Sequence, residues 1–211
     1  MENKKGIEKG DRHMNVQYLR VMCFIFILSI AVPVLAAEPM EAIKQTTDKV
    51  LSIVTNPALK PPSKASEKEK LIRQAVDERF DWQEMTRRSL ATHWAKRTPE
   101  ERKEFVRLYS DLLERTYLTK VEDYSGEKVL YEGENKEGNY ATVKVKIVTK
   151  ENKDIPVEYR LKKEGNNWLI YDVSIEGVSL VQNYRTQFNS IISQSSYENL
   201  VKRLREKAEL K

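Results

Sequence analysis

The apolar residues of the chain follow two different periods, one helical and one strand-like. From about residue 40 to about residue 120 they recur at spacings of three and four, which predicts a series of amphipathic helices. The sequence Thr98-Pro99-Glu100-Glu101 supplies an N-cap, a proline for the first turn and two carboxylates for the positive end of a helix dipole. We therefore expect a long helix after Thr98, with Leu112, Leu113 and Tyr117 on its apolar face.

Beyond Ser125-Gly126 apolar and polar residues alternate, which is the pattern of strands with one buried face. Two of the alternating runs place Val143 and Val145, then Val157 and Tyr159, on such a face. Segments that contain Asn and Gly separate the runs and suit hairpin connections, so we predict four consecutive strands in an antiparallel meander. The last of the four runs has these apolar residues in one phase: Leu169, Tyr171, Val173 and Ile175.

The segment around Glu176-Gly177 joins this strand pattern to a returning helical pattern. Val181, Tyr184 and Phe188 follow it at helical spacing, so we expect a strand that turns directly into a helix over about residues 180–193. The predicted order is helices, four strands, helices. An antiparallel sheet with one apolar face needs a cover. We therefore predict an α+β fold in which N- and C-terminal helices cover one face of a curved, four-stranded sheet.

Residues 1–37 have the composition of a secretory signal peptide. Lysines and arginines precede an apolar stretch from Val21 to Leu35, and Ala36-Ala37 supplies the small residues of a cleavage site. The apolar stretch is shorter than the roughly 20 residues of a transmembrane helix, and an uncleaved N-terminal anchor is the alternative. We predict a signal peptide at residues 1–37, followed by a single exported domain at residues 38–211.

The composition of the expected mature chain argues against several classes of site. Cys23 is the single cysteine and lies in the apolar stretch, so cleavage removes thiol nucleophiles, disulfides and sulfur ligands for metals. His93 then remains without a second histidine with which to hold a metal. The chain has a formal net charge of +5, but both signs are intermixed along it. This mixture argues against binding of nucleic acid, which requires a concentrated basic stripe.

The residues show no catalytic constellation. There is neither a glycine-rich phosphate loop nor a nucleophile elbow around Ser174 or Ser179. Asp172 is a candidate buried acid on a strand, and a lone acid in such a domain resembles the base of cone-shaped isomerases and dehydratases. The partner that such a site needs is missing. We predict a protein that is not an enzyme, with a small-molecule isomerase or hydratase and a non-catalytic adaptor as the alternatives.

Tyrosines are the most distinctive residues of the predicted interior. A filled core whose hydroxyl groups form hydrogen bonds at its margin would use them, and so would a hollow apolar cavity. Periodicity does not separate these two arrangements. The tyrosines expected to point toward the same interior are Tyr109, Tyr117, Tyr140, Tyr159, Tyr171 and Tyr184.

The most distinctive block of the chain is Gly177-Val178-Ser179-Leu180-Val181, with Asn183-Tyr184-Arg185 and Gln187-Phe188 after it. This block and several others together resemble the MlaC family, whose members are periplasmic phospholipid-shuttle proteins and toluene-tolerance auxiliary components of ABC transporters. One position departs from the family pattern, because Ala91 stands where the family has glycine, a small-for-small change. The other matching blocks are Phe80–Met85, Thr98–Phe105, Pro156–Tyr159 and Trp168–Val173.

The resemblance implies a soluble, monomeric carrier in the periplasm of a Gram-negative bacterium. Such a protein binds a glycerophospholipid as cargo, with its acyl chains in an apolar cavity between sheet and helices, and needs no cofactor or metal. It carries the lipid between an outer-membrane lipoprotein complex and an inner-membrane ABC transporter with an MCE-domain subunit, which maintains the lipid asymmetry of the outer membrane.

The resemblance and the inward phase of each element together assign the lipid contacts. Tyr171 and Tyr184 are expected to face each other across the cavity. Arg185 is expected at its mouth near the lipid phosphate, and an ion pair with Asp172 or Glu176 is the alternative. The expected tail contacts are Leu112, Leu113, Tyr117, Val143, Val145, Val157, Tyr159, Tyr171, Val181, Tyr184 and Phe188.

Overall fold

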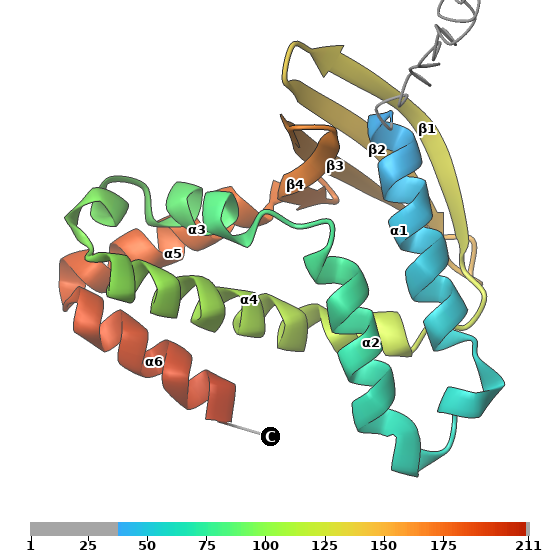
Figure 1. Ribbon diagram of the computed structural model, residues 1–211, viewed down its shortest axis with the longest axis horizontal. Helices are drawn as coiled ribbons and strands as arrows, with labels where there is room; N and C mark the ends of the chain where they lie inside the picture. The colour runs from blue at the N-terminus through green and yellow to red at the C-terminus, as the bar shows by residue number, and fades with distance from the viewer. Residues whose placement is uncertain (1–37, 210–211) are drawn as a thin grey trace, which may run out of the picture. The chain divides into compact units, whose positions relative to one another are not determined.

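The computed structural model describes residues 38–209, apart from the side chains of residues 118, 119 and 209, and these residues form an α+β fold (Figure 1). The predicted signal peptide at residues 1–37 lies outside the described residues. The expected order of elements is confirmed. In chain order they are α1 (Pro39–Val54), α2 (Ala65–Asp77), α3 (Trp82–Leu90), α4 (Pro99–Glu122), β1 (Lys128–Glu137), β2 (Tyr140–Val148), β3 (Asp154–Glu164), β4 (Asn167–Ile175), β5 (Val178–Ser179), α5 (Leu180–Gln194) and α6 (Tyr197–Glu209).

The long helix α4 begins as its sequence predicts. The hydroxyl of Thr98 accepts a hydrogen bond from the Glu101 amide at 3.2 Å, and the Glu101 carboxylate accepts one from the Thr98 amide at 2.8 Å. This reciprocal capping box satisfies two amides that would otherwise lack partners at the helix start. At the end of α3, Ala91 has φ +47° and ψ −121°, which no α-helix accommodates. A 3₁₀ segment over Ala91–Lys96 therefore follows α3.

The sheet is antiparallel throughout, in the strand order β1-β2-β3-β4-β5. The predicted inward phases of β2 and β3 are confirmed, because Val143 is paired with Tyr159 and Val145 with Val157 on the face that the core covers. The strand count differs from the prediction. A two-residue turn at Glu176-Gly177, with φ +50° and +81°, returns the chain into the short β5 before α5 begins.

The predicted phase of β4 is wrong in its first half. Arg160 is paired with Asp172, but Leu161 is paired with Ile170, so Tyr171 is an extra residue that forms a β-bulge. The bulge reverses which side chains point inward. The buried apolar residues are Trp168 and Ile170 before it and Val173 after it, in place of Leu169 and Tyr171.

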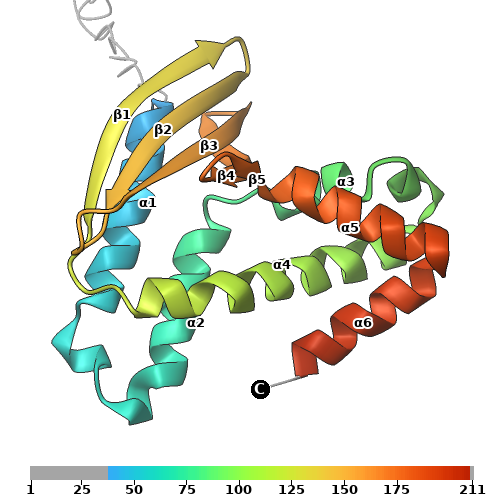
Figure 2. The ribbon, with the colours of Figure 1, turned by 180° about the vertical axis from the view of Figure 1, so that it is seen from behind.

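Helices cover one face of the sheet, as the sequence predicts. Helix α1 packs against β1 and β2 and also against α2, while α3 and α5 pack against β4. Figures 1 and 2 both show α1 running along the sheet, with α4, α5 and α6 side by side. The outer edge of β4 is covered as well. The amide of Asp81 donates to the carbonyl of Ile170, whose own amide donates to the carbonyl of Arg79, both at 2.8 Å, and β5 covers the remainder of the edge.

Candidate functional site

One wall of the candidate site is helical and aromatic. The ring of Tyr109 on α4 lies 5.2 Å from that of Tyr184 and 5.3 Å from that of Phe188, both on α5, in edge-to-face geometry. Tyr109 and Phe188 are fully enclosed, whereas Tyr184 is half-buried. Burial raises the pKa of the Tyr184 phenol, and it does the same for Tyr117. The ring cluster thus fixes α5 against α4 and leaves Tyr184 at its margin.

The opposite wall is the inner face of the sheet. Val143, Val145 and Val157 are buried there, and Tyr159 is half-buried among them. Burial raises the pKa of Tyr159 to about 12, with the nearby Tyr131 phenol as a further cause. The phenols of Tyr131 and Tyr159 therefore lie on an apolar surface, where their charged phenolate forms are disfavoured.

The structure places all the predicted tail contacts in, or against, one hydrophobic cluster. Half-buried members of this cluster are the ones that a ligand can reach without unfolding the core, and they come from both walls. Fully buried members instead set the shape of the walls. The half-buried contacts are Leu112, Tyr117, Tyr159, Tyr171 and Tyr184, and the buried ones are Leu113, Val143, Val145, Val157, Val181 and Phe188.

Tyr171 is half-buried against the same cluster, but the expectation that it faces Tyr184 is wrong. Its ring contacts that of Tyr140 edge-to-face at 5.9 Å, and the Arg88 guanidinium lies 4.1 Å from its centroid. Tyr171 lines a polar surface hollow of about 480 Å³ together with Arg88, Tyr140 and Arg160. The β4 bulge is the physical reason, because it removes Tyr171 from the alternation that places Val173 inside.

Arg185 lies at the surface, between α5 and the end of α3. Its Nε donates to the backbone carbonyl of Arg88 at 2.9 Å, and its Nη1 donates to Gln182 Oε1 at 3.3 Å. It lines a second hollow of about 470 Å³ that His93 and Asn189 also line. The structure thus gives Arg185 neutral oxygen partners and keeps it beside an open hollow.

The alternative expected for Arg185, an ion pair with Asp172 or Glu176, is wrong because each carboxylate has another cation. Arg160 lies 3.2 Å from Asp172, and Lys153 lies 3.1 Å from Glu176.

Asp172 holds the start of α5. Its carboxylate accepts hydrogen bonds from the Ser179 hydroxyl at 2.7 Å and from the Val181 amide at 3.0 Å. A carboxylate at a helix N-terminus compensates the positive end of the helix dipole. Arg160 is a third donor, so both carboxylate oxygens of this buried side chain accept hydrogen bonds. The sequence suggested Asp172 as a buried acid or as an ion-pair partner of Arg185, and this capping role was missed.

The sequence model of the MlaC protein family matches residues 44–206. The chain belongs to the MlaC family. A curated relative is the intermembrane phospholipid transport system binding protein MlaC of Haemophilus influenzae, which is 22% identical over 125 residues. That match covers 56% of this chain and 58% of the relative's length.

A solved structure shares the MlaC-family fold. The phospholipid-binding protein from Ralstonia solanacearum, determined in complex with a phospholipid, superposes with a TM-score of 0.74 at 25% sequence identity. The match covers 82% of this chain and 97% of that protein. The α+β arrangement predicted from the sequence is therefore the arrangement of a known lipid-binding relative.

Two features of this MlaC-family chain were missed as members of the site. Tyr131 lies on the inner face of β1, and burial raises the pKa of its phenol. The alternation of Val129 with Tyr131 is the sequence signal that could have identified it. The second feature is a set of ion pairs between α2 and α4, for which the sequence holds no local signal.

Among residues 38–209, the structure contains no helix that is both long and apolar enough to cross a membrane.

Proposed function

We propose that this protein is a carrier that binds a glycerophospholipid by its acyl chains between the inner face of the sheet and the α4–α5 wall. It moves the lipid between the outer-membrane lipoprotein complex and the inner-membrane ABC transporter with an MCE-domain subunit. The family match supports this function, as does the phospholipid in the Ralstonia relative. The observation that carries it is the set of half-buried apolar side chains on both walls of one hydrophobic cluster.

The energetics of a diacyl lipid explain why such walls are needed. Two acyl chains contain roughly 30 methylenes, and at about 0.8 kcal/mol each their exposure to water costs on the order of 20 kcal/mol. A carrier must therefore cover both chains. A bilayer offers the same apolar surroundings, so the free energy of transfer from protein to membrane is small and a docked partner can shift it.

The proposed tail contacts are those of the two walls. Tyr117, Tyr159 and Tyr184 combine apolar rings with hydroxyl groups at the margin, which suits the boundary between acyl chains and the glycerol esters. Tyr171 is not among the proposed tail contacts, because it lines the polar surface hollow with Arg88, Tyr140 and Arg160. Arg185 stays a proposed neighbour of the lipid phosphate, since a surface guanidinium with neutral partners is available to an anion.

Asp172 favours a carrier over an isomerase or hydratase. A general base must reach the proton that it abstracts. This carboxylate instead caps α5 and pairs with Arg160. The proposed carrier acts in the periplasm as a monomer after removal of a signal peptide, and it thereby maintains the lipid asymmetry of the outer membrane.

Native mass spectrometry tests the central claim. The protein, purified without detergent or exposed to phospholipid vesicles, is expected to carry a mass equal to one diacyl glycerophospholipid. Denaturation should release that mass. A protein that carries no such mass under either condition would sink the proposal.

A further inference from the structure

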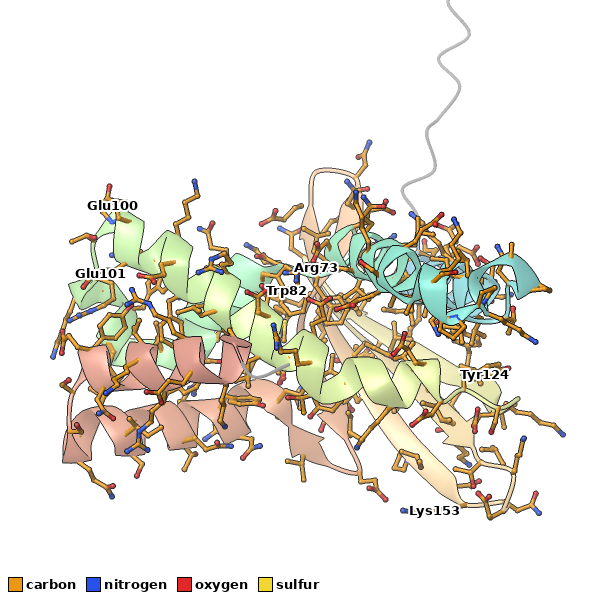
Figure 3. The ribbon with its side chains drawn as sticks, turned by 90° about the horizontal axis from the view of Figure 1, so that it is seen from below. Arg73, Trp82, Glu100, Glu101, Tyr124 and Lys153 are labelled. Carbon is orange, nitrogen blue, oxygen red and sulfur yellow. The ribbon has the colours of Figure 1, made fainter. Side chains whose placement is uncertain are left out.

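Helices α2 and α4 are bridged by charged side chains. Arg73, which Figure 3 labels, belongs to α2. It donates from Nη2 to Asp111 Oδ1 at 2.7 Å and from Nη1 to Glu114 Oε2, and both carboxylates belong to α4. Toward the C-terminal end of α4, Lys68 on α2 lies 3.3 Å from Glu122. The bridge therefore extends along both helices at two separate levels.

Helices α2 and α4 pack their buried residues against other helices. Ile72 and Ala75 are the buried side chains of α2, and α2 packs against α1. Helix α4 packs against α3 and α6, with Phe105 and Leu108 enclosed. Arg73, Asp111 and Glu114 thus connect two parts of the molecule that each have their own apolar packing, and α4 also carries Leu112 and Tyr117 of the proposed lipid site.

We propose that Arg73, Asp111 and Glu114 form a clasp that opens when a lipid enters or leaves the interior. The inference rests on the proposed lipid-carrier function. Separation of an apolar helix interface would expose hydrocarbon to water, whereas separated charges regain hydration, so an ion-paired contact opens at low cost. The clasp also has a preferred closed state, because Asp111 and Glu114 lie three residues apart on one helix and repel each other. The Arg73 guanidinium contacts both carboxylates and reduces this repulsion, whereas Arg107, 3.5 Å from Asp111 on the same helix, pairs with Asp111.

The clasp controls rates and leaves affinity almost unchanged. Both uptake and release pass through the open state, so a weaker clasp accelerates both. Arg73→Ala is expected to raise the rate of fluorescent glycerophospholipid transfer from the loaded protein to phosphatidylethanolamine and phosphatidylglycerol vesicles by about fivefold, the factor given by loss of a partly exposed ion-pair cluster. Lipid content at equilibrium, measured by native mass spectrometry, should stay within about twofold of the unmodified protein, since both rates change together.

Arg205→Ala is the matched control. Arg205 on α6 also pairs with a carboxylate of α4, with its Nε 2.8 Å from Glu104 Oε1. There the two helices are held by buried side chains as well, among them Phe105 and Leu200. Its loss should leave the transfer rate unchanged. Arg73→Lys, which keeps the charge without the two-pronged reach, should give an intermediate rate.

The salt dependence of the transfer rate is a second measurement. Raising the NaCl concentration from about 50 mM to about 500 mM should accelerate transfer by the unmodified protein and by Arg205→Ala more than by Arg73→Ala, which keeps only the Lys68–Glu122 pair of the bridge. Equal transfer rates for Arg73→Ala and the unmodified protein, or a salt response that is the same in both, would overturn the clasp. Absence of bound lipid from the unmodified protein would overturn the carrier function itself, so the two failures are distinguishable.

Discussion

Arg88 stacks its guanidinium 4.1 Å from the centre of the Tyr171 ring, and this contact belongs to the polar hollow on the outer side of the sheet. The backbone carbonyl of the same arginine accepts a hydrogen bond from Arg185 on α5. Arg88 thereby joins α3, β4 and α5. Two tyrosines that the sequence predicted to face one cavity, Tyr171 and Tyr184, therefore have separate surroundings.

Substitution by glutamate should abolish lipid binding at Tyr184 and leave it unchanged at Tyr171. Tyr184→Glu places a carboxylate in an apolar wall beside Tyr109, which is costly for a charge without a partner, so we expect loss of lipid retention. Tyr171→Glu places the same carboxylate beside Arg88, where it can pair, so normal lipid content is expected. Native mass spectrometry measures both, and circular dichroism verifies that each variant is folded. A Tyr184→Glu variant that keeps its lipid would remove Tyr184 from the site.

Replacement of Asp172 by asparagine should lower the free energy of unfolding without affecting lipid binding. The change removes the charge that Arg160 and the first turn of α5 share. A loss of about 2 kcal/mol in the free energy of unfolding is expected, as for a hydrogen-bonded charged group. Urea denaturation measures this loss. Unchanged stability combined with loss of a measurable turnover would instead support the isomerase or hydratase alternative.

Ala91→Gly should stabilise the protein. A side chain at φ +47° and ψ −121° is strained by about 1–3 kcal/mol, while glycine loses about 0.5–1 kcal/mol more backbone entropy on folding. A net gain of about 1 kcal/mol is expected from thermal or urea denaturation. Ala95→Gly, in the same 3₁₀ segment but without a positive φ, is the control and should destabilise. The small-for-small departure from the family pattern at Ala91 therefore has a cost in backbone strain.

Glu84 should make stability depend on pH in acid. Hydrogen bonds from Arg87 and then Arg88 hold the pKa of this nearly buried carboxyl at about 2, below its usual 4.5. A lowered folded-state pKa contributes stability above pH 4.5 that is lost as the pH falls toward 2. Glu84→Gln should therefore cost about 2 kcal/mol at neutral pH and little near pH 2.

The control for Glu84 is Glu67→Gln, which removes an exposed carboxylate paired with Lys64 one turn away on the surface. It should change the free energy of unfolding by less than about 0.5 kcal/mol across the same pH range. Urea denaturation at several pH values compares the two variants. A penalty for Glu84→Gln that is the same at pH 3 and pH 7 would contradict the assigned pKa.

The parts of the fold that sequence could predict are those with local causes. The cap at Thr98 and the apolar face of α4 act within one helix, and the alternation around Val143 and Val157 marks a half-covered sheet. The phase of β4 could not be predicted, because a bulge adds one residue and reverses the parity that the alternation relies on. Tyr171 was misplaced for that reason alone.

The candidate site was predictable only as two sets of inward side chains. Residues such as Leu112 and Tyr159 carry their inward phase in the sequence, and the structure places them in one cluster. Their contact with lipid stays a prediction, since a filled core and a ligand-bearing one share the same periodicity. Arg73 could not be identified at all, because its partners on α4 are about 40 residues away. The sequence around Arg73 and the sequence around its partners each have the pattern of an ordinary solvent-exposed helix face.

The covered edge of β4 has a consequence for self-association. Residues 79–81 occupy one half of that edge and β5 the other, so β4 presents no free row of amides and carbonyls to a neighbouring chain. Unpaired strand edges are the usual starting points of edge-to-edge aggregation. The protein is thereby protected on that side from polymerising through its sheet, and the proposed carrier would need this protection each time a lipid enters or leaves its apolar interior.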